Sequence, residues 1–405
     1  MEHISKQLEV LRQRLARIDQ KYAQAGDRPA APRVLPGGTV IANDLGEHVQ
    51  ITCSWPSHHR HGTADLGSLS EIPADLFAPL GEEFLEPSSP LKWAFLDTET
   101  TGLAGGSGTM AFLIGVGWIS ERGFELKQYF LRNHADEPSA LGALAQQLEE
   151  FELLVTYNGK AYDQPLLETR YRLARQKPPF ARLRHLDLLF SARRLWRLAL
   201  ESCRLQDLES RILGVQRTDD PGGALIPRLY FDYLRSADAQ PLGPVIAHNA
   251  TDILSLACLT AIVPGAFREP FAVTRGAEMV GLARWLRAEG RAEEALELMR
   301  RAMKRPMPDA LVYETLWHIA DLERKLGRGD AALAAWVELT TVANPWQAQA
   351  YERLAIHYER TERNPAMALE MTRAALSLDP DCEPLRKREA RLAEKAARPR
   401  PARLL

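Results

Sequence analysis

The sequence has little cysteine and no long apolar run. Its 405 residues include four scattered cysteines and no CxxC pair, so we expect neither a zinc site nor a disulfide framework. No run of about 18 apolar residues suggests a transmembrane helix, and the first residues lack the apolar core of a secretory signal. These absences predict a cytoplasmic protein with no membrane partner.

The chain also lacks a strong net charge. Its formal charge is −2, which gives no global sign of a nucleic-acid partner. Residues 168–204 differ, because they hold ten basic side chains against three acidic ones. This cluster indicates a surface for phosphate groups, and a set of solvated helix faces explains the same count.

Residues 1–90 are expected to form an N-terminal region ahead of the main domain. Apolar side chains recur every three or four residues from Ile4 to Tyr22. This spacing predicts an amphipathic helix that packs on the same chain or forms a short coiled-coil dimer. A linker rich in proline and glycine follows, and a hairpin is then predicted from Thr39–Ala42 and His48–Cys53.

Three histidines follow the predicted hairpin within four residues, at His58, His59 and His61. Imidazole is a common metal ligand. No acidic or cysteine side chain is adjacent in the sequence, so a polar loop is the other interpretation.

From residue 91 strands and helices alternate, and residues 91–265 are expected to form one α/β domain. Three closely spaced strands are predicted to be antiparallel neighbours, and a helix from Ser139 leads to a fourth strand that its crossover makes parallel to the first. These strands are Leu91–Leu96, Ala111–Ile119, Phe124–Leu131 and Leu153–Thr156. A strand at His185–Leu188 and helices at Leu205–Leu213 and Pro244–Ile262 complete the expected domain.

Two carboxylates, Asp97 and Glu99, follow the first of these strands. Residues two apart project to the same face of a strand, where like charges repel unless a cation lies between them. Hard oxygen ligands of this kind suit Mg²⁺ or Mn²⁺. The alternative is that these acids only cap the end of the strand.

Further polar groups follow the fourth strand and open the last predicted helix. Asp163 would begin a helix near the strand end that carries Asp97, and helix capping is its alternative role. His248 and Asp252 are one helical turn apart, so their side chains would share a face. The order of these acidic clusters favours one common site.

Residues 272–395 are expected to form helices only. Gly290, Gly327 and Asn364 each precede an Ala-Leu pair by four or five residues, and this pattern recurs every 36 or 37 residues. This period predicts helical hairpins and is similar to tetratricopeptide repeats. Such repeats bind a peptide or protein partner, and a structural cap on the preceding domain is the alternative.

Together the acidic motifs resemble the DEDD superfamily of 3′–5′ exonucleases, which have a ribonuclease H-like mixed sheet flanked by helices. Asp97 and Glu99 match its first motif, Asp163 its second and Asp252 its third. The second motif, YNGKAYDQP, is similar to that of the proofreading domains of B-family polymerases. The layout of DTETTGLAGGSGT, RTDDPGG and HNATDILSL is similar to the YprB-like branch, which also carries tetratricopeptide-like repeats.

The resemblance implies phosphodiester hydrolysis with two Mg²⁺ or Mn²⁺ ions. Asp97 would bridge both ions, Glu99 and Asp252 would complete the first, and Asp163 would hold the second. His248 departs from the family, because its spacing from Asp252 is that of the tyrosine class; it is expected to accept a proton from water.

Three residues are expected to contact the terminal nucleotide: Thr101, Leu103 and Asn158. Thr101 and Leu103 lie at the start of a glycine-rich bend. The alternative interpretation of this bend is a plain hairpin turn with no contact to substrate.

The expected function is therefore that of a 3′–5′ exonuclease acting on DNA in repair. RNA is the alternative substrate, because no residue is seen to read the 2′-hydroxyl. An inactive scaffold that presents the helical repeats to a protein partner is the rival of another class. A helicase is the expected partner, from family association alone.

Overall fold

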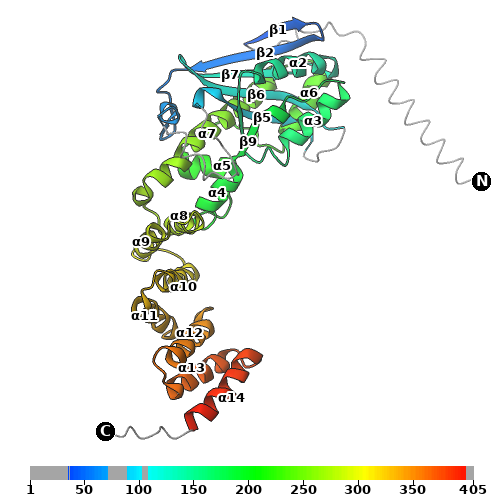
Figure 1. Cartoon of the computed structure of the whole chain (residues 1–405). Helices are drawn as coiled ribbons and strands as arrows, with labels where there is room; N and C mark the ends of the chain where they lie inside the picture. Colours follow the sequence, from blue (N-terminus) through cyan, green and yellow to red (C-terminus); the bar gives the residue numbers. More distant parts are fainter. Residues whose placement is uncertain (1–34, 36, 72–88, 103–107, 398–405) are drawn as a thin grey trace, which may run out of the picture.

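The computed structural model describes residues 35, 37–71, 89–102 and 108–397. An α/β domain is followed by a rod of paired helices (Figure 1). The predicted N-terminal helix, most of the linker and Leu103 lie outside the described residues.

The α/β domain contains a seven-stranded mixed sheet in the order β1-β2-β7-β6-β5-β8-β9. Neighbours are antiparallel along this order as far as β5, and β5, β8 and β9 are parallel. The strands are β1 Gly38–Asn43, β2 Gly46–Trp55, β5 Trp93–Thr100, β6 Ala111–Ser120, β7 Gly123–Phe130, β8 Leu153–Thr156 and β9 Arg184–Asp187. The mixed sheet, its three antiparallel neighbours and its parallel fourth strand confirm the predictions.

The N-terminal hairpin belongs to this same sheet. Strand β2 pairs with β7 over seven residues, from Val49 opposite Phe130 to Trp55 opposite Phe124. The sheet therefore begins well before residue 91, where the change in sequence pattern had suggested a new domain. The pattern did not reveal this because the two strands are joined by a long segment, whereas the other antiparallel neighbours follow one another closely.

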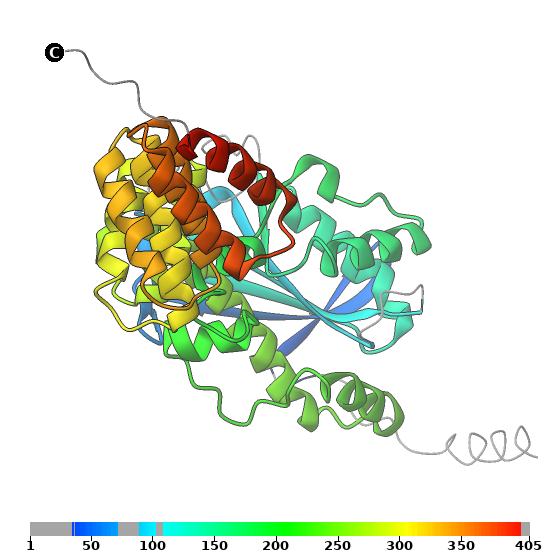
Figure 2. The ribbon, with the colours of Figure 1, turned by 90° about the horizontal axis from the view of Figure 1, so that it is seen from below.

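Alternate residues of β5 face two hydrophobic cores, as the period of a strand requires. Trp93 and Phe95 lie in the core that includes α4 and α7, and Ala94 and Leu96 lie in the core with α2, α3 and α6. The helices are α2 Glu137–Leu148, α3 Asp163–Leu173, α4 Leu188–Trp196, α6 Ile226–Ser236 and α7 Gly243–Arg268. Figure 2 shows the sheet between these helices.

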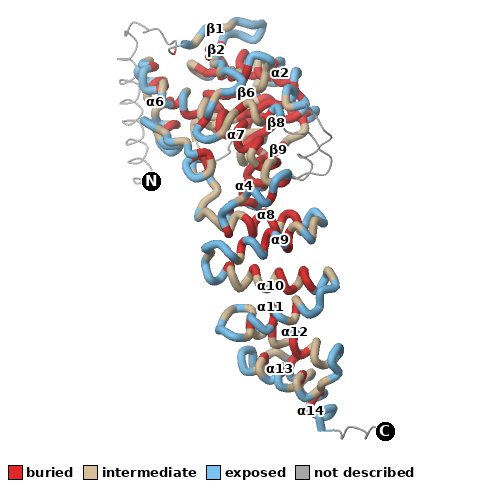
Figure 3. The backbone as a smooth tube through the Cα atoms, turned by 90° about the vertical axis from the view of Figure 1, so that its left-hand side faces the viewer, coloured by how far each residue is buried: buried red, intermediate tan, exposed pale blue. Residues whose placement is uncertain are grey.

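Helix α7 is the long apolar helix of the domain. The segment Gln240–Arg268 is long and apolar enough to cross a membrane by length and composition. However, 67% of its most apolar window is buried inside the protein, and buried residues run along much of the helix (Figure 3). The apolar character of α7 is therefore that of a core helix.

The rod consists of stacked antiparallel helices, and the prediction of an all-helical region is confirmed. They are α8 Gly276–Ala288, α9 Ala292–Ala302, α10 Asp309–Lys325, α11 Gly329–Thr340, α12 Gln347–Arg360, α13 Pro365–Leu378 and α14 Glu383–Ala397. The first two hairpins turn at Gly290 (φ +80°) and Gly327 (φ +78°), where a left-handed backbone favours glycine. In the third hairpin Arg363 takes this conformation, and Asn364 instead caps α13 by accepting a hydrogen bond from the Met367 amide.

The first hairpin of the rod shares a hydrophobic core with the α/β domain. Leu195 of α4, Leu259 of α7 and Leu282 of α8 lie in the same cluster. A side chain at Gly281 would place its Cβ 2.5 Å from the Leu195 carbonyl oxygen, so only glycine lets α8 pack this closely on α4. The junction between the domain and the rod is therefore closely packed.

Candidate active site

Strand β5 supplies the first two acids of the site. Asp97 lies opposite Gly115 of β6 and Glu99 opposite Leu113, and the register shifts just after Glu99. Both carboxylates therefore lie in the last four residues of the strand, near the end where β8 leads into α3. This placement agrees with the prediction that the two acids lie where the first core strand ends.

Two glycines of β6 let α7 approach these acids. A Cβ at Gly115 would lie 2.3 Å from the Asn249 Oδ1 atom, and one at Gly117 would lie 2.5 Å from the Ile253 Cγ2 atom. Both distances are far below van der Waals contact, so larger residues would force α7 away from the sheet. The GVG of β6 thus sets how close the residues of α7 lie to Asp97.

Asn249 of α7 connects Asp97 to the interior of the sheet. Its Nδ2 atom donates to the Asp97 Oδ2 atom at 2.8 Å, and its Oδ1 atom accepts from Gln128 Nε2 at 2.8 Å. Both amides are fully buried. A buried amide with partners on both sides fixes the carboxylate that it contacts. No pattern in the sequence pointed to Asn249 or Gln128, although Asn249 directly follows His248.

We expect Asn249→Leu to lower catalytic activity by about 10- to 100-fold, as the loss of a group that orients a ligand does. The reason is that Asp97 loses its only described side-chain donor while keeping its charge. Steady-state cleavage rates over a Mg²⁺ titration would measure this, with Asn344→Leu, at a loop between rod helices, as the matched control. A variant with normal activity would show that Asp97 does not depend on Asn249.

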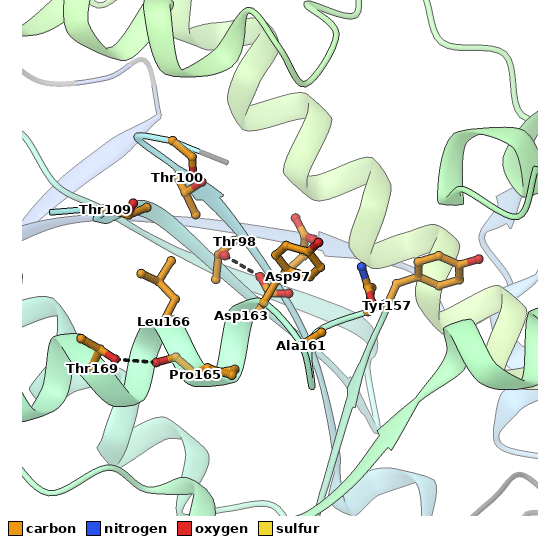
Figure 4. A pocket seen from close by; sticks show the side chains of 13 residues that line it. Asp97, Thr98, Thr100, Thr109, Tyr157, Ala161, Asp163, Pro165, Leu166 and Thr169 are labelled. Atoms are coloured by element: carbon orange, nitrogen blue, oxygen red, sulfur yellow. Dashed lines mark hydrogen bonds between the residues drawn. The ribbon is translucent and has the colours of Figure 1, made fainter. Parts of the chain in front are cut away.

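Asp163 begins α3 directly after the loop that follows β8, as predicted. Its Oδ1 atom accepts a hydrogen bond from the Thr98 hydroxyl of β5, which Figure 4 shows as a dashed line. The loop before α3 is fixed by Asp187, whose carboxylate accepts from the backbone amides of Asn158 at 2.7 Å and Lys160 at 3.1 Å. The structure therefore brings Asp163 beside the strand that carries Asp97.

His248 and Asp252 lie on one face of α7, toward Glu99. The His248 Nε2 atom is 3.6 Å from Glu99 Oε1 and 3.6 Å from Asp252 Oδ2. On the other side of the ring, His248 Nδ1 lies 2.5 Å from Asp220 Oδ1. An Nδ1–H that donates to Asp220 would leave Nε2 directed at the two acids. The five predicted catalytic residues thus meet at one place.

An arginine that no sequence pattern singled out also enters this site. Arg217 donates to both oxygens of Glu209 at 2.6 Å and forms a hydrogen bond with Asp252. Its Nη1 atom lies 2.9 Å from His248 Nδ1, the nitrogen that also faces Asp220, so an Nδ1–H that donates to Asp220 accepts no hydrogen bond from Arg217. Its sequence motif, RTDDPGG, belongs to the family-like layout, but spacing alone gave its members no role.

The partner of this arginine comes from an irregular helix. Helix α5 (Leu205–Leu208) runs on into a π-helical turn, η6 (Glu209–Leu213), which ends at Gly214 with φ +68°. Such turns are rare and often accompany functional sites. Glu209 has only 1% of its side chain exposed and Arg217 has 11%. The π-helical turn therefore places a buried carboxylate that holds Arg217 against Asp252.

We expect Glu209→Gln to reduce the free energy of unfolding by about 2 kcal/mol, the scale of a lost hydrogen bond to a charged group. The amide keeps the shape of the side chain but leaves Arg217 without its two-oxygen partner. Asp252 then becomes the main carboxylate that neutralises the positive charge of Arg217. Chemical denaturation would measure the stability, and the Mg²⁺ concentration for half-maximal activity should rise. Glu362→Gln, at an exposed loop, is the control; equal stability of the two variants would contradict the expectation.

The acids of the site repel one another. Burial, followed by the charges of Asp252, Glu99 and Asp163, raises the pKa of Asp97 well above its usual value. Burial and the charges of Asp252 and Asp163 do the same to the pKa of Glu99. Burial raises the pKa of Asp163 to about 6, although the Thr98 hydroxyl opposes it. Burial also raises the pKa of Asp252. Four such carboxylates within interaction range favour a bound cation.

The donor chemistry fits a hard divalent cation, because the site offers carboxylate oxygens from β5, α3 and α7. Within the described part of the chain, no three acidic, histidine or cysteine side chains lie in a ready-made metal cluster. Arg217 pairs with Asp252 and Asn249 with Asp97, so both carboxylates already have a partner. Binding of a cation would require Asp252 to share or exchange that partner.

A cavity of about 580 Å³ opens beside Asp97 and Asp163 (Figure 4). Thr98, Thr100 and Tyr157 line it together with Asn158, which was predicted to contact substrate. Thr101 instead accepts a hydrogen bond from the Met110 amide, and its neighbours Thr100 and Gly102 line the cavity. Leu103 lies outside the described residues.

The comparisons with known proteins agree with this geometry. Residues 94–263 match the family model described as RNase_H superfamily. All five predicted catalytic residues lie within this match. The chain is also similar to the uncharacterized protein YprB of Bacillus subtilis (strain 168), with 29% identity over 354 residues and 84% of each chain covered. The RNase H-like domain supports a hydrolase that processes nucleic acid, and such nucleases generally use divalent metals such as Mg²⁺.

The three histidines of the N-terminal loop have separate partners within the described structure. His58 contacts Asp65 at 3.3 Å, the His59 ring lies against Trp55, and His61 forms a 2.7 Å hydrogen bond with Ser255 of α7. Burial and nearby positive charge lower the pKa of His61 to about 4. The neutral His61 therefore connects this segment to α7.

Proposed function

We propose that this protein is a metal-dependent 3′–5′ exonuclease that hydrolyses DNA. The observation that carries the proposal is the meeting of Asp97, Glu99, Asp163 and Asp252 beside His248 in an RNase H-like domain. Their mutual repulsion is costly in a protein that binds no cation. The 3′–5′ polarity and the preference for DNA come from the resemblance to DEDD exonucleases.

The four acids would hold two Mg²⁺ or Mn²⁺ ions. When bound, these ions would stabilise negative charge on the phosphate and lower the pKa of water. Asp97 would contribute to both ions because it lies among the other three acids. Glu99 and Asp252 would serve one ion from the side of His248, and Asp163 would serve the other from the side of the cavity.

His248 would remove the proton from the attacking water. Its Nε2 atom faces Glu99 and Asp252, and its Nδ1 atom faces Asp220. A carboxylate that accepts from Nδ1–H fixes the ring and makes Nε2 a better proton acceptor. The hydrogen bond from His248 and the charge of Arg217 keep the pKa of Asp220 low despite its partial burial, so Asp220 stays ionised for this role.

The cavity beside Asp97 would receive the terminal nucleotide. Thr98, Thr100 and Thr109 bring hydroxyl groups to it, and Tyr157 and Tyr162 bring aromatic rings. Aromatic side chains stack on bases with little sequence preference. Asn158 is a proposed contact at its rim, and Thr101 and Leu103 are proposed contacts of the adjoining bend.

An RNA exonuclease is the alternative within the same chemistry. The alternative of another class is an inactive scaffold, and the pairing of Arg217 with Asp252 is the observation that favours it. A thermal unfolding series with and without Mg²⁺ separates the two classes, since a cation bound by the native state must raise the melting temperature.

The biological role that we propose is DNA repair in the cytoplasm. Residues 91–265 would provide catalysis and residues 272–395 would act as tetratricopeptide-like repeats. Hairpins such as α10–α11 and α12–α13 form a stacked array of the kind that presents an extended surface to a partner. A helicase that exposes strand ends is the proposed partner.

The test is the degradation of end-labelled DNA and RNA of one sequence, single- and double-stranded, in Mg²⁺, Mn²⁺ or EDTA. Stepwise loss of nucleotides from the 3′ end, dependent on the metal, is the expected result. Loss from the 5′ end would overturn the polarity, and loss of RNA alone would overturn the substrate. No cleavage of any strand would favour the scaffold.

A further inference from the structure

A second hollow adjoins the catalytic cavity and is lined by arginines. It has a volume of about 730 Å³ and shares Tyr157 and Asn158 with the cavity beside Asp97. Arg193, Arg197 and Arg204 line it, with Glu201 as the single acidic residue. The positive surplus therefore lies directly next to the place where a phosphodiester would be cleaved.

These arginines differ from others in the basic segment 168–204. Arg170 is paired with Glu137, Arg172 with Glu168, and Arg182 contacts backbone carbonyls. In the part of the chain that the structure describes, Arg193, Arg197 and Arg204 are exposed and form no ion pair. Within the basic segment 168–204, these three arginines are therefore available to bind an anion.

The arginines continue toward the helical rod. A third hollow, of about 550 Å³, shares Arg193 and Arg197 with the second and is closed on its other side by Gly281, Arg284 and Trp285 of α8. Arg284 is already paired with Glu314. The Arg194 guanidinium lies 5.0 Å from the Trp285 ring centroid. Because Gly281 packs directly on α4, the third hollow lies at the closely packed junction between the domain and the rod.

Aromatic rings accompany the charges. Phe190, Arg193, Arg194 and Arg197 follow the three- and four-residue spacing of one helical face, and Phe190 is 52% exposed. Tyr157 stands between the first two hollows, and its hydroxyl donates to the Cys203 carbonyl. Cationic grooves with aromatic rings are typical of single-stranded nucleic-acid sites, since a duplex hides the faces of its bases.

We propose that a single nucleic-acid strand leaves the catalytic cavity past Tyr157 and runs along Arg193 and Arg197 to the junction of α4 with α8 (Figure 1). This path rests on the proposed nuclease function and adds to it the strand state of the substrate and a role for the first hairpin of the rod. The phosphates would lie against the arginines, and unpaired bases would stack on Tyr157 and Phe190.

The test is strand binding by the full-length protein carrying Asp97→Asn, so that a bound strand persists in Mg²⁺. Fluorescence anisotropy would follow labelled oligothymidylate and oligouridylate of about 20 nucleotides, longer than a typical site of ~4–16 nucleotides. The double variant Arg193→Glu/Arg197→Glu is compared with Arg228→Glu/Arg235→Glu. The two control arginines are exposed on α6, the helix that packs against the other core of the sheet. Their substitution makes the same change in net charge.

We expect the groove variant, Arg193→Glu/Arg197→Glu, to bind the strand at least about tenfold more weakly than the parent. Its slope of log K against log[salt] should fall by about 1.4, or ~0.7 for each lost phosphate contact. The control should bind as the parent does. Equal losses in both variants, or an unchanged slope in the groove variant, would overturn the path. Binding of a blunt duplex as tightly as the single strand would overturn the strand state.

Binding and cleavage are read separately, so the two proposals fail separately. If the protein with native Asp97 cleaves strands but the arginine reversal leaves binding intact, the path is wrong and the nuclease function stands. If no strand is cleaved under any condition but binding depends on Arg193 and Arg197, the nuclease function is wrong and the binding surface stands. The Asp97→Asn parent is tested with both oligothymidylate and oligouridylate. The one that it binds more tightly identifies whether DNA or RNA occupies the path along Arg193 and Arg197.

Discussion

Asp97→Asn should lower the cleavage rate by about 10³-fold or more, which exceeds the ~10- to 100-fold cost of removing a group that only orients a metal ligand. The structural reason is the position of Asp97 among Glu99, Asp163 and Asp252, all of which contribute to its raised pKa. An uncharged amide would remove a carboxylate that interacts with all three of the others. Single-turnover degradation of an end-labelled strand, at saturating Mg²⁺, would measure the effect on the chemical step.

The same substitution should leave the fold intact and raise its stability in EDTA. The introduced amide has the shape of the native carboxylate, and its carbonyl oxygen can still accept the hydrogen bond from Asn249, while one of the repelling charges is gone. Circular dichroism melting in EDTA checks this, and Asp232→Asn, on the exposed face of α6, is the matched control. A cleavage rate equal to that of the unaltered protein would falsify the assignment of Asp97 to the site.

The acids could be found in the sequence because each follows a recognisable boundary between elements. Asp97 and Glu99 end a short apolar run, Asp163 opens a helix after another, and Asp252 lies one turn after His248. Periods of two and about four residues are local properties, and they determine which side chains share a face. The same reasoning found the four central strands of the sheet and their directions.

The rest of the site depends on contacts that have no local signal. Asn249 reaches Asp97 only because Gly115 removes a side chain from the neighbouring strand. Arg217 reaches Asp252 because Glu209 holds it from a π-helical turn, and nothing in the spacing of these residues predicts that pairing. The β1–β2 hairpin was likewise recognised as a hairpin, but its pairing with β7 spans a long sequence separation.

Arg217 gives the site a counter-ion of its own. Asp252 has 15% of its side chain exposed and contacts both the arginine and His248. A buried carboxylate without a partner would be costly, so the ion pair with Arg217 stabilises the protein while no cation is bound. Asp163 has a hydroxyl as its partner rather than a cation. The acids therefore differ in how much a metal ion would relieve them.

This difference predicts a pH dependence of stability in the absence of metal. The pKa of Asp163 is about 6 in the folded protein against an ordinary value of 3.8, so the unfolded chain loses this proton first. The stability associated with the protonated form is fully present below about pH 4 and is lost as the pH rises through 6. Asp97 and Glu99 have pKa shifts in the same direction.

From Asp163 alone, the free energy of unfolding in EDTA should fall by about 1 to 2 kcal/mol between pH 5 and pH 8, at 1.36 kcal/mol per pKa unit and allowing for partial ionisation at pH 5. Urea denaturation of the unaltered protein and of Asp163→Asn gives this quantity as the difference between the two pH profiles. The difference is needed because buried histidines such as His61 and His185, whose pKa values burial lowers to about 4, change stability in the opposite direction over part of this range.

Mg²⁺ should abolish most of this pH dependence, because a bound cation replaces the proton as the partner of the carboxylates. The rise in melting temperature on adding Mg²⁺ should therefore be larger at pH 8 than at pH 5, and smaller in Asp163→Asn than in the unaltered protein. If Mg²⁺ raised the melting temperature equally at both pH values and in both proteins, its binding site would lie away from Asp163. A fold that needs a cation to relieve these charges at neutral pH is expected of a metal-dependent nuclease and not of a scaffold.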